Sequence, residues 1–294
     1  MSGGGGGAAP SGIRIREIDV AVLRTAVARL LAEANVRIPD DILEGLRQAA
    51  LREQSELGRR TLEQIVRNYE VAAAERLPVC QDSGLTVVHL EVGQDVHWVG
   101  GSVTEAIHDG IRDGTRSGFL RASVTGDPIA RRNTGDNAPG VIHVDLVPGD
   151  RVKLTVASKG FGSENMSALR MLIPADGLGG VRRFVVETVD RAGANSCPPV
   201  VVGVGIGGTF EMAALLAKKA VLRPIDRRHE RADISRLELE LLDEVNALGI
   251  GPQGFGGIVT ALAVNVEVYP THIAGLPVAV NIGCHSNRRM SQEL

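Results

Sequence analysis

The sequence predicts an α/β fold with mixed sheet elements, flanking helices and a helical layer at the N-terminus. Residues 17–75 repeat apolar positions at helical spacing. From residue 85 onward, short β-branched runs alternate with amphipathic segments. The 294 residues are 44% hydrophobic and 23% charged, which is typical of a globular chain. We therefore expect one α/β domain over residues 13–294, preceded by a disordered, Gly-rich tail over residues 1–12.

The N-terminal layer is expected to contain three helices. Apolar pairs recur from Val22 to Leu31, which predicts a first amphipathic helix. Pro39 begins a second helix. Thr61 opens a capping-box pattern before Ile65, which predicts the start of a third.

Beyond Cys80 the pattern changes to that of strands. Leu85–Val92 and Val96–Val99 are expected to pair with each other, and Ser102 to cap a helix that follows. Pro148-Gly149-Asp150 predicts a hairpin-like connection between strands Val141–Val147 and Val152–Ser158.

The second half of the chain alternates helices and strands. Helices are expected at about 163–172, 180–192, 209–221 and 233–247. Strands are expected at Val200–Ile206, Ile258–Tyr269 and Pro277–Ile282.

Charge and composition exclude several functions. The net charge of −3 provides no basic field for nucleic acid, and 3% aromatic residues are too few for base-stacking platforms. Nothing approaches the ~18 consecutive apolar residues of a membrane span. The N-terminus lacks the features of a secretory signal, so we expect a cytoplasmic protein.

The three cysteines each lie at a turn beside a predicted strand. Cys80, Cys197 and Cys284 are widely separated, and no C-x-x-C pair occurs. An odd number without a signal peptide argues against a disulfide framework. They are either unrelated buried thiols or members of one site that the fold assembles, because loops at strand ends are where site residues collect.

Three Gly-rich loops are candidates for binding an anion or for ordinary tight turns. They span residues 159–165, 203–209 and 249–257. The second contains G-x-G-x-x-G spacing, but no acidic residue follows at the end of a second strand, so dinucleotide binding is disfavoured. A small carboxylate suits these loops better than a phosphate.

Polar residues near the cysteines have both functional and structural interpretations. Asp82, beside Gln81, could carry protons or could cap a turn. Arg121 could bind a carboxylate or belong to the solvated surface. His272 precedes the strand that leads to Cys284 and could equally be structural.

Several motifs together resemble the iron–sulfur class I fumarate hydratase and L(+)-tartrate dehydratase family. The resemblance is to its alpha subunit, or to the N-terminal domain of single-chain members, and covers nearly all of the chain from about residue 15. The motifs are Cys80-Gln81-Asp82-Ser83-Gly84, Lys159-Gly160-Phe161-Gly162-Ser163-Glu164-Asn165, Cys197-Pro198-Pro199, Gly205-Ile206-Gly207-Gly208 and Gly251-Pro252-Gln253-Gly254.

The resemblance implies a [4Fe–4S] cluster held by Cys80, Cys197 and Cys284, with one iron left open as a Lewis acid. It implies Asp82 as the catalytic residue. The implied substrate contacts are Gln81, Arg121, Gly160, Gly162 and His272.

It also implies reversible dehydration of a small hydroxy-dicarboxylate, foremost (S)-malate to fumarate and water, with L(+)-tartrate dehydration as the alternative. Ser83 stands where fumarases often carry Thr, which bears on the choice of substrate. A separate beta subunit is expected to supply the remaining active-site groups in a heterotetramer or larger assembly. Non-enzymatic alternatives are an iron–sulfur interaction protein and a zinc scaffold of the three cysteines with His285 or His272.

Overall fold

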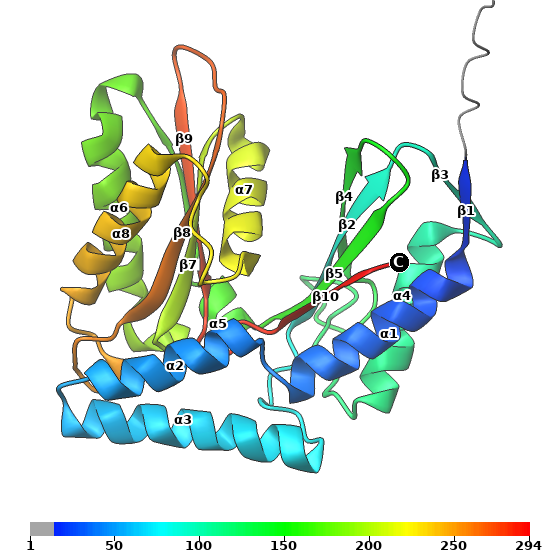
Figure 1. The fold of residues 1–294 in the computed structure, drawn as a ribbon, viewed down its shortest axis with the longest axis horizontal. Helices are drawn as coiled ribbons and strands as arrows, with labels where there is room; N and C mark the ends of the chain where they lie inside the picture. Colours follow the sequence, from blue (N-terminus) through cyan, green and yellow to red (C-terminus); the bar gives the residue numbers. More distant parts are fainter. Residues whose placement is uncertain (1–14) are drawn as a thin grey trace, which may run out of the picture.

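The computed structural model describes residues 15–294, so the expected tail over residues 1–12 lies outside the described residues. Two four-stranded sheets lie side by side, and helices cover them and run beneath (Figure 1). This confirms the α/β class and the helical N-terminal layer. Division into a single domain over residues 13–294 stays a prediction.

The N-terminal layer consists of α1 (Val20–Val36), α2 (Asp40–Arg52) and α3 (Glu56–Glu75), after a short strand β1 (Arg16–Asp19). The Asp19 side chain accepts a hydrogen bond from the Ala21 backbone and caps α1. The expected capping box at Thr61 is wrong. Ser55 caps α3 instead, and the Thr61 hydroxyl donates to the Leu57 carbonyl inside the helix.

The first sheet has the order β10-β5-β2-β4. Its strands are β2 (Leu85–Gly93), β4 (Val141–Val147), β5 (Val152–Lys159) and β10 (Arg289–Glu293), and β2 is parallel to β4 but antiparallel to β5. Helices α1 and α4 (Val103–Ser117) pack together on one side of it (Figure 1). Ser102 caps α4, as expected.

Two pairing expectations for this sheet are wrong. Strand β3 (Val96–Val99) pairs with β1 rather than with β2, and β4 does not form a hairpin with β5 because β2 lies between them. The reason is burial. Strand β2 is largely buried and takes a central place, whereas β4 alternates with exposed positions and forms an edge.

The second sheet has the order β6-β9-β7-β8. Its strands are β6 (Ala168–Leu172), β7 (Val200–Gly207), β8 (Ala261–Tyr269) and β9 (Leu276–Gly283). Helices α6 (Gly177–Ala192) and α8 (Ala232–Asn246) cover one face and α7 (Phe210–Leu222) the other (Figure 1). Short 3₁₀ turns lie at Pro174–Asp176, Gly193–Ser196 and Pro252–Gly254.

The helix expected at residues 163–172 is wrong. Only α5 (Phe161–Glu164) is helical, and Ala168–Leu172 becomes edge strand β6, antiparallel to β9. A short apolar run can form either a helix or a strand, and here pairing with β9, far along the chain, makes it a strand.

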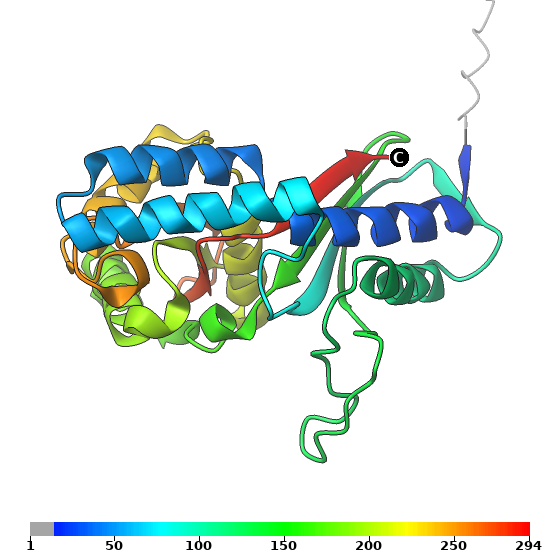
Figure 2. The same ribbon diagram turned by 90° about the horizontal axis from the view of Figure 1, so that it is seen from below.

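Helices α2 and α3 run beneath the sheets (Figure 2), and through them the N-terminal layer packs against the second sheet. Ile42, Leu46 and Leu62 share a buried cluster with Val79 and Val201. Between α4 and β4 the chain makes a long excursion that projects from the body (Figure 2). Over the described residues, none of the helices has the length and apolar character needed to span a membrane.

Candidate active site

Strand pairing brings the Cys197 and Cys284 segments together. Strands β7 and β9 are antiparallel with Val201 opposite Gly283, so the start of β7 lies beside the end of β9. Cys197 precedes β7 and Cys284 follows β9. The His285 N–H donates to the Cys197 carbonyl over 3.3 Å, which links the two segments directly.

The Cys80 segment reaches the same place from the helical layer. Val79 is buried in the cluster that contains Val201, and its N–H donates to the Asn35 carbonyl of α1 over 2.8 Å. The Asp82 N–H lies 3.4 Å from the Cys80 sulfur, and the Cys80 thiol lies 3.5 Å from Gln81 Oε1. Gln81 itself is exposed.

The three thiols are free and partly buried, and they influence one another. Burial raises the pKa of the Cys197 thiol, and negative charge on Cys284, Cys80 and Asp82 raises it further. Three thiols in mutual electrostatic range form the donor set that a cluster with three cysteine ligands requires.

Cys284 has a different electrostatic environment. Burial acts to raise its pKa, but the Arg288 guanidinium, hydrogen bonds from Ser286 and the Lys159 ammonium outweigh burial, and the net pKa is lowered. The Cys284 sulfur lies 3.1 Å from the Ser286 hydroxyl. This environment favours the thiolate, the form that binds metal.

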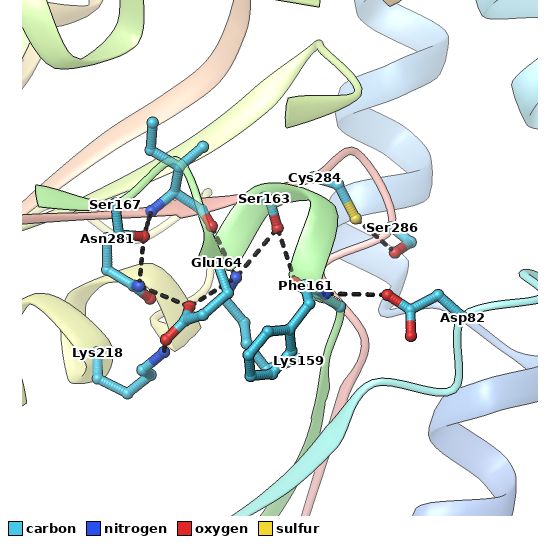
Figure 3. A network of polar contacts seen from close by, with 12 residues as sticks. Asp82, Lys159, Phe161, Ser163, Glu164, Ser167, Lys218, Asn281, Cys284 and Ser286 are labelled. Atoms are coloured by element: carbon cyan, nitrogen blue, oxygen red, sulfur yellow. Dashed lines mark hydrogen bonds and ion pairs between the residues drawn. The ribbon is translucent and has the colours of Figure 1, made fainter. Parts of the chain in front are cut away.

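Asp82 connects the Cys80 segment to the Gly160 loop. Its Oδ1 accepts from the Gly84 N–H over 2.8 Å. Its Oδ2 accepts from the Phe161 N–H over 2.9 Å, as Figure 3 shows. A Cβ on Gly160 would stand 3.2 Å from Asp82 Oδ2, so the glycine permits a close approach. Gly162 lies against the segment before Cys197, since its Cβ would be 3.5 Å from the Asn195 carbonyl.

Asp82 and Arg121 line one pocket of about 610 Å³. Arg121 lies at the start of the projecting excursion, which also contributes Arg131 to the wall, and Phe161 of α5 lines the pocket as well. The backbone carbonyl of Arg121 accepts from the buried Asn137 side chain over 2.9 Å, so the arginine is anchored at its backbone. The pocket therefore presents one carboxylate and two guanidinium groups to a small polar molecule.

A buried ionic network supports α5 from behind (Figure 3). Lys159 Nζ lies 2.9 Å from Glu164 Oε2 and donates to the Ile282 carbonyl over 2.7 Å, just before Cys284. Lys218 pairs with the other Glu164 oxygen, and Asn281 donates to Glu164 Oε2 over 2.8 Å. Burial acts to raise the pKa of Glu164, but the two lysines outweigh it and hold the pKa at about 2.

His272 lies apart from the other expected site residues. It is exposed in the turn between β8 and β9, at the opposite end of β9 from Cys284. Its Nδ1 accepts from the Ala274 N–H over 3.2 Å. Within this chain, strand β9 separates it from the thiols.

Sequence reasoning missed two residues at the site, Arg288 and Asn35. Both are buried, and Arg288 Nη1 donates to Asn35 Oδ1 over 2.8 Å. A signal was present, because Arg288 follows Cys284 by only four residues, in the short connection between β9 and β10.

Among residues 15–294, no three His, Cys, Asp or Glu side chains converge closely enough to share a single metal ion. A [4Fe–4S] cluster does not require its ligands to converge on one metal ion, because each thiolate binds a separate iron. The donor set of three free thiols fits that group.

The fold and this site define a class: an α/β enzyme with three thiols on neighbouring segments and a pocket that Asp82, two residues after Cys80, lines together with arginines. Residues 24–293 match the model of the fumarate hydratase (Fumerase) family. The chain belongs to this family and is a hydro-lyase of the fumarate hydratase and tartrate dehydratase alpha type.

Relatives agree with this assignment. A Methanocaldococcus jannaschii protein, provisionally named L(+)-tartrate dehydratase subunit alpha, is 41% identical over 90% of this chain and 94% of its own length. The L(+)-tartrate dehydratase subunit alpha of Escherichia coli strain UTI89 is 34% identical over 91% of this chain and 89% of its own. The protein of that name from strain K12 is 33% identical over the same shares.

Proposed function

We propose that this chain is the alpha subunit of a [4Fe–4S] hydro-lyase that dehydrates a small hydroxy-dicarboxylate. The observation that supports this most directly is the approach of Cys80, Cys197 and Cys284 at one end of the second sheet. The pocket that contains Asp82 and Arg121 is lined by the segment that follows Cys80 and by the Gly160 loop.

Cys80, Cys197 and Cys284 hold the cluster, which when bound supplies an open iron as Lewis acid for the departing hydroxyl group. Arg121 binds a substrate carboxylate through its guanidinium fork. Asp82 accepts the proton from the carbon adjacent to the one that bears the hydroxyl group, directly or through a group of the second subunit. Its hydrogen bonds from Gly84 and Phe161 hold the carboxylate oxygens in position.

Two substrates fit this chemistry. The relatives are named for L(+)-tartrate, which favours L(+)-tartrate to oxaloacetate and water. The family model is named for fumarate hydratase, which keeps (S)-malate to fumarate and water as the second candidate. Assays of both acids with the same loaded enzyme, compared by kcat/KM, decide between them.

The cluster is tested by anaerobic reconstitution. We expect about four irons and matching acid-labile sulfide per chain, as a [4Fe–4S] cluster requires. Cys80→Ala, Cys197→Ala and Cys284→Ala should each lose the cluster, whereas His272→Ala should retain it because His272 lies at the far end of β9. Zinc without sulfide would instead support a metal scaffold.

A partner subunit is the second part of the proposal, and the alpha-subunit names of the relatives support it. The pocket offers Asp82, Arg121 and Arg131, and a second subunit would supply the other carboxylate contacts and exclude water. The loaded chain should be inactive alone and active with its partner, in a heterotetramer or larger assembly. Full turnover by the isolated chain would contradict this.

A further inference from the structure

Arg288 is a buried cation with too few partners. Its side chain is 3% exposed, and its Nη1 donates to the neutral Asn35 Oδ1 over 2.8 Å. No carboxylate of residues 15–294 forms an ion pair with it, and its Nε is buried without a hydrogen-bond partner. The neighbouring Arg289 differs, because its Nη2 lies 2.6 Å from the Asp41 carboxylate.

Both the side chain and the backbone of Arg288 are held in place by hydrogen bonds. Asn35 is fully buried, and its amide nitrogen donates to the Leu31 carbonyl and to the Ser158 hydroxyl, which leaves its oxygen for Arg288. The Arg288 carbonyl accepts from the Ser158 N–H over 3.1 Å. A buried charge with one neutral acceptor is unfavourable unless an anion compensates it.

The position of Arg288 indicates where that anion is. Its Nη2 stands 3.4 Å from the Cβ position of Gly160, so the guanidinium lies between the Gly160 loop and the Cys284 segment. Arg288 follows Cys284 by four residues, and the Asn287 N–H donates to the Cys284 carbonyl over 3.2 Å, which keeps this connection short. Asp82 Oδ2 stands 3.2 Å from the same Cβ position of Gly160, but it accepts the Phe161 N–H and forms no ion pair with Arg288. The thiolates of the adjoining cysteine segments are therefore the anionic groups left to compensate the guanidinium.

We propose that Arg288 is a positioning residue whose counter-charge is the set of three thiolates with its bound cluster, so that it stabilises the loaded site over the empty one. The inference rests on the proposed function. A cluster held by three thiolates carries a net negative charge, which compensates Arg288, whereas neutral thiols leave the guanidinium uncompensated.

The test compares Arg288→Gln and Arg288→Lys with the matched controls Arg289→Gln and Arg289→Lys in the full chain after anaerobic reconstitution. Two quantities are measured: the rate of iron loss to a chelator, and the Tm of the loaded and the empty forms. Arg288→Gln should lose iron about ten- to a hundredfold faster than wild type, the usual effect of removing a group that supports metal ligands. The Tm of its empty form should be unchanged or higher.

Arg288→Lys keeps the charge without the fork, so its iron loss should lie between wild type and Arg288→Gln. Arg289→Gln removes the ion pair with Asp41 and Arg289→Lys alters its geometry, so each should lower both Tm values equally and leave iron loss unchanged. Equal Tm losses in both forms for Arg288→Gln, with wild-type iron loss, would overturn the inference. So would a raised KM with wild-type iron retention, which would make Arg288 a substrate anchor.

A failure of the proposed function can be told apart from a failure of this inference about Arg288. It would show as wild-type protein that takes up no cluster, before any variant is compared, and it would overturn both proposals.

Discussion

The Asp82 carboxylate accepts the backbone N–H of Phe161 over 2.9 Å and so joins the Cys80 segment to the Gly160 loop. Its other oxygen accepts the Gly84 N–H over 2.8 Å, which closes an Asx turn. The same carboxylate faces the pocket that contains Arg121. Substitutions at Asp82 therefore combine a structural effect with an effect on proton transfer, and the choice of variant separates them.

Asp82→Asn should lower kcat by at least about a hundredfold while the cluster absorbance is retained, because the amide keeps much of the shape but is a poor proton acceptor. Steady-state kinetics on reconstituted enzyme measures this. Asp176→Asn is the control, since that carboxylate also accepts a backbone N–H, from Ile173 over 2.9 Å, but belongs to a distant 3₁₀ turn. Wild-type kcat in Asp82→Asn would leave Asp82 with the structural role alone.

Arg121→Lys should lower kcat/KM about tenfold or more, because an ammonium does not reproduce a bidentate contact to a carboxylate. Arg132→Lys serves as the control, because Arg132 is exposed on the same excursion and does not line the pocket. Kinetic constants of both variants are compared at equal iron content. Equal values for Arg121→Lys and wild type would assign Arg121 to the solvated surface.

Glu164→Gln should lower the free energy of unfolding by about 3 kcal/mol, because it leaves the Lys159 and Lys218 ammonium groups close together without a counter-charge. Denaturant unfolding of the empty chain measures this. The Glu187→Gln control breaks a pair with Arg170 in which both side chains are more than half exposed. It should change stability by no more than about 0.5 kcal/mol.

The stabilisation that the Glu164 carboxylate gives to the folded chain also depends on pH in a defined way. Its pKa is held at about 2, below the ordinary value of 4.5. The stabilisation is therefore fully present above the ordinary value and is lost as the pH falls toward 2. Glu164→Gln should make stability less dependent on pH in this range, and an unchanged slope would contradict the prediction.

His89 should make the protein less stable in mild acid. Burial, together with the charges of His143, Lys219 and Lys218 and against that of Asp145, lowers the pKa of His89 from 6.5 to about 4. Between pH 6.5 and 4 the unfolded chain binds a proton that the folded chain does not, so stability falls as the pH falls, by up to about 3 kcal/mol.

His89→Gln should flatten this slope in denaturant unfolding measured at several pH values. His97→Gln, at an exposed position on β3, should leave the slope as in wild type. Parallel slopes for His89→Gln and wild type would exclude His89 as the source.

Gly205→Ala should destabilise the fold by roughly 3 kcal/mol, because a Cβ would stand 2.1 Å from the Ala213 carbonyl where α7 crosses β7. Gly179→Ala, on the exposed face of α6, is the control. Its Cβ would lie 3.5 Å from the tip of Arg183, so it should be neutral or stabilise by about 0.5–1 kcal/mol. Thermal unfolding compares the two variants. Close packing between α7 and β7 thus accounts for Gly203 and Gly205 of the G-x-G-x-x-G pattern.

Local sequence was sufficient for most helices and for the site motifs. The apolar periodicity of α1, α4, α6, α7 and α8 is a property of each segment alone, because one buried face repeats every turn. The turn positions of the three cysteines were likewise visible in short stretches, and the motif set led to the family that the comparisons confirm.

Tertiary structure alone decided which strands pair and which side chains meet. The segment Ala168–Leu172 became a strand because β9 offered it an edge, and β2 took the centre of its sheet because its residues are buried. The antiparallel register of β7 and β9 set Cys197 beside Cys284 and sent His272 to the far end of the same strand. Contacts between residues far apart in the sequence depend on this register, and no local pattern encodes it.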